Sequence, residues 1–194
     1  MRNRQALTAR RRVIAGEGID AATIVEIAEP ADVGAETVYN WFWVQQRTSR
    51  FVMELMDRLA RRIEVVTNTF SDPAQVYAFG VRNVMMAATT DQRWSWPLRR
   101  YEFIAGAMYT VMGPYAIRDI RNAVAKGRYR VEDPELAWRQ ATHAIVGFSL
   151  AVRDKELRPE KIDEAVVNLL GMVGVARGEA WEIAKRPHPA LPSE

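Results

Sequence analysis

The sequence predicts an all-α protein, because its hydrophobic residues recur with helical spacing and no window shows sustained alternation of period two. Asp72-Pro73 and Asp133-Pro134 supply helix start signals, since Asp is a favoured N-cap and Pro fits the first helical position. Of the 194 residues, 48% are hydrophobic and 26% are charged, as in a folded globular chain. We therefore expect a series of helices around an apolar core.

The first of these helices are short. One contains Val13 and Ile14 and is expected to end at Gly16, and Thr23 is placed to cap a second. Pro30 ends the second helix, a turn follows at 31–34, and a third helix is predicted to begin near Ala35. Two short helices joined by a tight turn are the form of a helix-turn-helix, whose second helix enters the DNA major groove. The sequence thus predicts a three-helix DNA-binding domain over residues 1–46.

The distribution of charge agrees with that assignment. The net charge is only +3, yet five arginines lie within the first twelve residues, and the remainder of the chain carries a small negative excess. A positive field confined to one end suits contact with phosphate at that end. A solvated, frayed terminus would show the same pattern.

A larger helical domain is predicted over residues 47–185. Its first helix lies within 46–69 and carries an apolar stripe. Further helices are expected from Pro73 to about Thr89, over 134–154 and over 159–176. A shorter helix with Ile117, Ile120 and Val124 on one face is expected between Gly113-Pro114 and Lys126-Gly127. The tail, 186–194, contains three prolines and is predicted to be disordered.

The last two long helices predict a homodimer. Residues 144–152 are apolar around the whole helix circumference, which indicates burial on two sides, one of them by a partner. The following helix has an apolar stripe, and on another face three glycines, Gly171, Gly174 and Gly178, that either let backbones approach or only weaken the helix end. Helices at about 134–154 and 159–176 would then form a four-helix interface between two chains.

Aromatic and Met side chains are frequent between residues 77 and 148, and such side chains suit a cavity for a small apolar or aromatic effector. For each residue alone, a place in the ordinary core is the simpler interpretation. His143 could offer the effector a polar contact or be a core imidazole. The candidate ligand-binding residues are Met86, Trp94, Trp96, Tyr101, Phe103, Met108, Tyr109, Met112, Trp138 and His143.

Composition excludes several classes of function. The chain has no Cys and only two His, so thiol catalysis, disulfides and Cys or His zinc sites lack their residues. We expect no metal, no cofactor and no enzymatic activity, because no catalytic cluster can be assigned. No stretch reaches the roughly 20 apolar residues of a membrane span, and no secretory signal is present, so a cytoplasmic location is expected.

The run GIDAATIVEIAEPADVGAETVYNWF, residues 18–42, resembles the DNA-binding domain of TetR-type transcriptional repressors. The matching features are Ala22-Thr23, Ile27-Ala28, the turn 32–34 and the Thr-hydrophobe-Tyr-x-x-Phe pattern over 37–42. The resemblance covers about the first 60 residues. It implies that a dimer binds a pseudo-palindromic double-stranded DNA operator and is released by a small effector.

The resemblance also implies roles for single residues. Thr23, Thr37 and Tyr39 match phosphate-contacting positions, whereas Ala35, Glu36 and Asn40 lie where base edges would be met. Arg4 belongs to a terminal arm that can reach phosphate or the minor groove. Gln45 stands where the family usually has a phosphate-binding Lys, and Pro30 shortens the second helix. These two departures keep an alternative open, namely a helical small-molecule-binding dimer whose DNA binding is weakened or lost.

Overall fold

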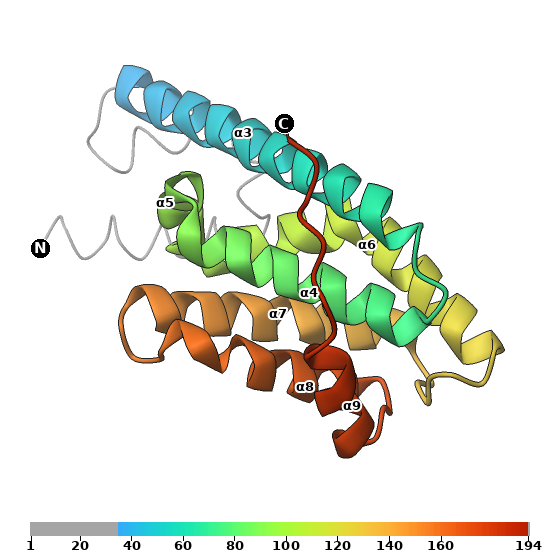
Figure 1. The fold of residues 1–194 in the computed structure, drawn as a ribbon. Coiled ribbons are helices and arrows are strands. Elements are labelled where there is room, and N and C mark those ends of the chain that lie inside the picture. Colours follow the sequence, from blue (N-terminus) through green and yellow to red (C-terminus); the bar gives the residue numbers. More distant parts are fainter. Residues whose placement is uncertain (1–34, 194) are drawn as a thin grey trace, which may run out of the picture. The chain divides into compact units, whose positions relative to one another are not determined.

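The structure, a computed structural model, describes residues 35–193, with side chains described for 50–100 and 104–193. Contacts between Cα atoms divide the chain into two units, Met1–Phe51 and Val52–Glu194. The side-chain contacts described for this protein lie within the second unit. Residues 35–193 contain helices and connecting segments but no strand, so the predicted all-α class is confirmed for them (Figure 1). The two helices predicted before Ala35 lie outside the described residues.

The helices follow in chain order. They are α3 (Ala35–Thr67), α4 (Pro73–Thr90), the 3-10 turn η1 (Gln92–Trp94), α5 (Ser95–Leu98), α6 (Tyr101–Ala125), α7 (Pro134–Arg153), the 3-10 turn η2 (Pro159–Lys161), α8 (Ile162–Met172) and α9 (Arg177–Ala184).

Helix α3 joins two helices that the sequence predicted separately, the one beginning near Ala35 and the one within 46–69. No Gly or Pro occurs between its ends, so no residue in this range forces a break. From Val52 onward, its apolar stripe packs into the core as predicted; Val52, Leu55, Met56, Leu59 and Val66 are all buried.

The two Asp-Pro start signals are confirmed. The Asp72 carboxylate accepts a hydrogen bond from the Ala74 N–H at 3.0 Å and caps α4. The Asp133 carboxylate accepts from the N–H groups of Glu135 and Leu136 at 2.9 and 3.0 Å and caps α7. Both helices end within a residue of the predicted position.

The prediction that Gly113-Pro114 precedes a shorter helix is wrong, because α6 continues through both residues. A Pro inside a helix costs about 3 kcal/mol through its missing N–H and its ring. Burial of Met108 and Met112 before the proline and Ile120 after it holds the helix on both sides. A Cβ at Gly113 would lie 3.5 Å from Trp138 Nε1, an ordinary van der Waals contact, so packing against α7 does not require a glycine at this position.

The predicted helix over 159–176 ends earlier, at Met172. Gly174 adopts φ +87°, and a Cβ there would lie 2.8 Å from the Arg130 Cβ. The Arg130 N–H donates to the Val173 carbonyl at 3.1 Å in the same turn. Gly174 is therefore required by a turn, whereas a Cβ at Gly171 or Gly178 would meet nothing within 4 Å. A further helix, α9, follows this turn.

Helix α4 is the central element, because α6, α7, α8 and α9 all pack against it (Figure 1). The buried Arg82 guanidinium donates to the Asp163 carboxylate and to the Ala184 carbonyl, which connects α4 with α8 and α9. Near the C-terminal end of α4, Arg153 Nε donates to the Ala88 carbonyl at 2.6 Å. Polar contacts thus hold α4 to its neighbours at its middle and near its C-terminal end.

The segment 186–193, predicted to be disordered, forms no helix or strand and runs along the helices (Figure 1). Arg186 Nη1 donates to Asp72 Oδ2 at 2.8 Å and to Gln75 Oε1 at 3.0 Å. Leu191 packs on the core, and the Pro192 carbonyl accepts from Arg62 Nε at 2.6 Å.

Asp72 provides a test of this anchoring. Burial raises its pKa, but hydrogen bonds from Arg128, from the Ala74 N–H and from Arg186 outweigh burial and hold the pKa below its ordinary value of 3.8. Such a group stabilises the fold above its unfolded-state pKa and loses this effect as the pH falls through the folded-state pKa. We expect Asp72→Asn to lower the free energy of unfolding by about 1 kcal/mol at pH 7. The difference from the unmodified protein should shrink as the pH falls below about 4.

Urea unfolding between pH 7 and pH 3 measures this difference. Asp133→Asn is the matched control, because the exposed Asp133 caps α7 and Asn caps a helix about as well as Asp. If the two variants lowered the free energy of unfolding equally at pH 7, the role assigned to the Asp72 charge would be wrong.

Candidate functional site

A cavity of about 80 Å³ lies among α3, α4 and α6. The last turns of α3 and the first half of α4 form two walls, and the middle of α6 forms the third. Tyr129, from the segment after α6, and Trp138, from α7, complete the lining. The lining is mostly apolar, with Ala60, Ile63, Val76, Val81, Val84, Met112, Ala116 and Ile120 among its residues.

Two residues that line this cavity each carry a buried polar atom without a hydrogen-bond partner among the described residues, the hydroxyl of Tyr77 and Nε1 of Trp138. Their side chains are nearly inaccessible, with 8% of Tyr77 and 4% of Trp138 exposed. Burial raises the pKa of Tyr77, so its phenol stays neutral. Buried polar groups normally have partners, so these two atoms, on residues of one lining, are candidates for binding a molecule in the cavity.

The neighbouring Tyr129 shows the usual arrangement. Its hydroxyl donates to the Pro73 carbonyl at 2.8 Å, and its ring meets that of Tyr77 edge to face, with centroids 6.2 Å apart. The adjacent Arg128 donates from Nε to Asp72 Oδ1 at 3.1 Å. The cap of α4 and this side of the cavity are therefore held by one cluster of contacts.

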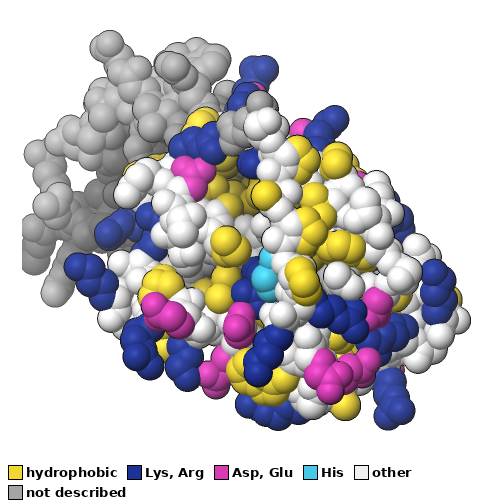
Figure 2. Space-filling model, viewed as in Figure 1, with side chains coloured by type: hydrophobic (Ala, Val, Ile, Leu, Met, Phe, Trp, Pro, Cys, Tyr) yellow, Lys and Arg dark blue, Asp and Glu magenta, His cyan; other side chains and the backbone are white. Residues whose placement is uncertain are grey.

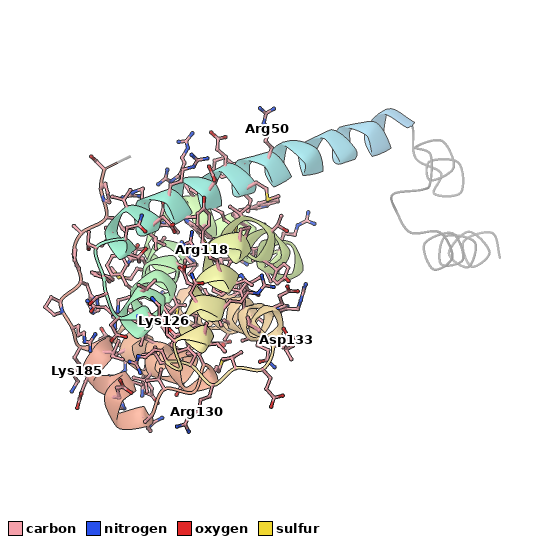
Figure 3. All side chains as sticks on the ribbon, turned by 90° about the vertical axis from the view of Figure 1, so that its right-hand side faces the viewer. Arg50, Arg118, Lys126, Arg130, Asp133 and Lys185 are labelled. Atoms are coloured by element: carbon pink, nitrogen blue, oxygen red, sulfur yellow. The ribbon has the colours of Figure 1, made fainter. Side chains whose placement is uncertain are left out.

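The charged lining residues are Glu64 and Asp119, both acidic. Arg118, on α6 beneath α3 in Figure 3, donates to Glu64 Oε1 at 3.0 Å and to Asp119 Oδ1 at 2.8 Å. The Arg118 guanidinium also lies 5.7 Å from the centre of the Tyr115 ring. The hydrogen bonds to Asp119 and Glu64 raise the pKa of Arg118, so this group stays a cation paired with both acids.

Of the ten predicted ligand-binding residues, Met112 and Trp138 line the cavity. Trp94 and Met108 are buried in the core elsewhere, and Met86 and Trp96 are exposed. Tyr109 lies outside the lining under the Arg139 guanidinium, 4.0 Å from its ring centre. His143 is exposed, and its Nδ1 lies 2.9 Å from the Arg139 carbonyl. The side chains of Tyr101 and Phe103 lie outside those described.

The list of candidates omitted most of the lining, including Tyr77, Tyr115 and Tyr129. Tyr77 and Tyr115 belong to the same aromatic-rich stretch, so composition marked the region but not the residues. The α3 residues Ala60, Ile63 and Thr67 carry no local signal, because their place in the cavity depends on packing between helices distant in sequence.

The predicted DNA-binding residues are not tested by the described side chains. Arg4 and Thr23 lie outside the described residues. Ala35, Glu36, Thr37, Tyr39, Asn40 and Gln45 belong to the first turns of α3, where the structure describes the helix but not the side chains.

The face shown in Figure 2 carries charges of both signs. Over its lower half, Lys and Arg side chains lie among Asp and Glu side chains. Within residues 35–193, no helix is long and apolar enough to cross a membrane. The same residues contain no group of three or more His, Asp or Glu that could hold a metal ion.

Comparison with protein families identifies the larger helical unit. Residues 72–186, more than half of the chain, match the family model described as "Tetracyclin repressor-like, C-terminal domain". The chain therefore belongs to the TetR family of transcription regulators, as the N-terminal motif predicted. This family is not one of enzymes, which confirms the prediction that the chain is not an enzyme.

Solved structures agree with this assignment. RolR in complex with resorcinol is 27% identical, with a TM-score of 0.69, and the match covers 98% of this chain and 96% of RolR. RolR without ligand is also 27% identical, covers 97% and 100% and has a TM-score of 0.68. The fatty acid degradation regulator FadR from Bacillus halodurans shares the fold at 20% identity, covering 88% and 95%, with a TM-score of 0.50. Comparison with curated proteins found no match.

The two tyrosines predict opposite effects on stability. Tyr77→Phe removes a buried hydroxyl that has no partner, so the free energy of unfolding should rise by about 1 kcal/mol. Tyr129→Phe leaves the Pro73 carbonyl without its donor and should lower it by about 1 kcal/mol. Thermal unfolding of the ligand-free variants measures both changes. Destabilisation by Tyr77→Phe as large as that by Tyr129→Phe would show that the Tyr77 hydroxyl has a partner in solution.

Proposed function

We propose that this protein is a ligand-responsive repressor that binds a pseudo-palindromic operator as a homodimer and is released by a small apolar or aromatic effector. The observation that carries the proposal is the apolar cavity with two unpartnered polar groups, in a chain of the TetR family. RolR, which shares 27% of its residues with this chain, has been solved with resorcinol, a small aromatic molecule. That likeness supports an effector of similar size.

Helix α3 supplies a route from effector to operator. Its first turns carry the residues proposed to contact DNA, and its last turns contribute Ala60, Ile63, Glu64 and Thr67 to the cavity. A molecule bound in the cavity would press on α3 and favour one position of this helix over another. For release to occur, the effector must bind the DNA-free state more tightly than the DNA-bound state.

The proposed dimer uses α7 and α8. On α7, Ile145, Val146 and Ser149 face the core, whereas Ala144 and Gly147 are exposed and Phe148 is half-buried. A hollow runs beside these residues, and Leu157 and Met172 also line it, with 42% and 40% of their surfaces exposed. An apolar face continued over two helices suits a second copy of the chain about a two-fold axis.

Selection of DNA from a random pool, followed by footprinting, tests operator binding. We expect two protected half-sites about one helical turn apart, with a steep salt dependence. Resorcinol and a set of small aromatic molecules are then added, and a compound that binds the cavity should weaken operator binding by about tenfold or more. Met86→Ala is the control, because Met86 is exposed and outside the cavity, so the response should persist.

Two outcomes would contradict this proposal. If every bound compound left the footprint unchanged, effector release would be wrong. If the protein bound small molecules but showed only weak, sequence-independent binding to duplex DNA, the alternative of a ligand-binding dimer with decayed DNA binding would replace the repressor.

The dimer is tested by adding a charge to its proposed face. Ala144→Glu would bury a carboxylate in the interface, so the dissociation constant of the dimer should rise more than about tenfold. Ala176→Glu is the matched control, since Ala176 is exposed, lies just before α9 and does not line the hollow. Sedimentation equilibrium measures both. A dimer equally stable in the two variants would place the interface elsewhere.

A further inference from the structure

Both lining residues that carry an unpartnered buried polar atom, Tyr77 and Trp138, can donate a hydrogen bond through that atom. Trp138 Nε1 carries a hydrogen and has no acceptor capacity, and the neutral Tyr77 hydroxyl can donate as well as accept. Both side chains are more than nine-tenths buried, so bulk water does not reach them freely. A molecule that supplies acceptors here recovers the free energy lost on burial of these groups.

Other polar groups in the lining already have partners within the protein. The Tyr129 hydroxyl donates to the Pro73 carbonyl at 2.8 Å, and the Thr67 hydroxyl donates to the Glu64 carbonyl at 3.3 Å. A bound molecule therefore gains less free energy by accepting a hydrogen bond from these hydroxyls than by accepting one from Tyr77 or Trp138. A hydrogen-bond acceptor is the one partner that would satisfy both groups, because Trp138 Nε1 can only donate and the Tyr77 hydroxyl can donate.

The charges of the lining limit what can carry that acceptor. Among the described residues, Glu64 and Asp119 line the cavity but no Lys or Arg does, and the nearby Arg118 is already paired with both acids. An anionic ligand would meet two carboxylates without a lining cation and would lose its own hydration on burial. A carboxylate is thus disfavoured even though its oxygens are good acceptors.

We infer that the ligand of this cavity is a small, uncharged and largely apolar molecule with an oxygen acceptor, such as a ketone or a phenol, that binds the Tyr77 hydroxyl and the Trp138 N–H. This inference rests on the proposed function for the use of the cavity, and it adds the chemical class of the effector. The apolar walls bind the carbon skeleton, and the two donors discriminate between molecules of the same shape.

Three compounds of nearly equal size test the inference by calorimetric titration of the full chain. Acetophenone carries a neutral carbonyl, α-methylstyrene replaces this oxygen by a methylene group, and benzoate carries a charge. Acetophenone should bind about tenfold more tightly than α-methylstyrene, since a satisfied buried hydrogen bond is worth up to about this factor. Benzoate should bind most weakly.

Variants assign this preference to the two donors. Tyr77→Phe keeps the ring and should reduce the ratio of the two affinities severalfold, chiefly by weakening acetophenone. Trp138→Phe should do the same, and Tyr77→Phe alone suffices if the smaller side chain at 138 disturbs folding. Tyr109→Phe is the control, because Tyr109 does not line the cavity, so the ratio should stay unchanged.

Several results would overturn the inference. These are equal affinity for acetophenone and α-methylstyrene, tightest binding of benzoate, a ratio unaffected by Tyr77→Phe, and no binding of any of the three. DNA selection in the absence of ligand is scored separately. Failure to find an operator would count against the repressor but not against a measured preference for the ketone, so the two failures are distinguishable.

Discussion

The Asp72 carboxylate holds together the part of the fold on which the rest depends. One oxygen caps α4 and contacts Arg128, and the other contacts Arg186. Because α6, α7, α8 and α9 all pack on α4, the position at which this helix begins sets the position of the core. The same carboxylate thereby connects three segments that lie far apart in the sequence.

The cavity follows from this arrangement. Tyr77 lies less than two turns after the cap, and Tyr129 is adjacent to the Arg128 that Asp72 holds, so the two rings meet at a fixed angle. Among the described residues, only one of the two hydroxyls finds an acceptor. Buried hydroxyls in a protein core normally have partners, and this imbalance is the reason we propose that the Tyr77 hydroxyl binds a ligand.

Helix α7 is apolar on two sides. One face supplies buried residues to the core, and Trp138 on this helix lines the cavity. The other face leaves Ala144 and Gly147 exposed beside Phe148. A helix that is apolar on both sides is more stable when both are covered, which is the reason we propose a second copy of the chain on the exposed face.

The sequence by itself determined the helical class, the starts of α4 and α7, the buried stripe of α3 and the family, because each depends on residues within a few turns of one another. Each Asp-Pro cap involves residues next to one another in the sequence, and the motif over residues 18–42 is defined by residue types at fixed spacing. Tertiary packing decided the rest. Burial on both sides carried α6 through Pro114, and the close approach of Arg130 ended α8 before Gly174. Tertiary packing also decided which aromatic residues come together, because Tyr77 and Trp138 line one cavity whereas Trp96 is exposed. Contacts between helices that are distant in sequence produce no periodic pattern from which this could be predicted.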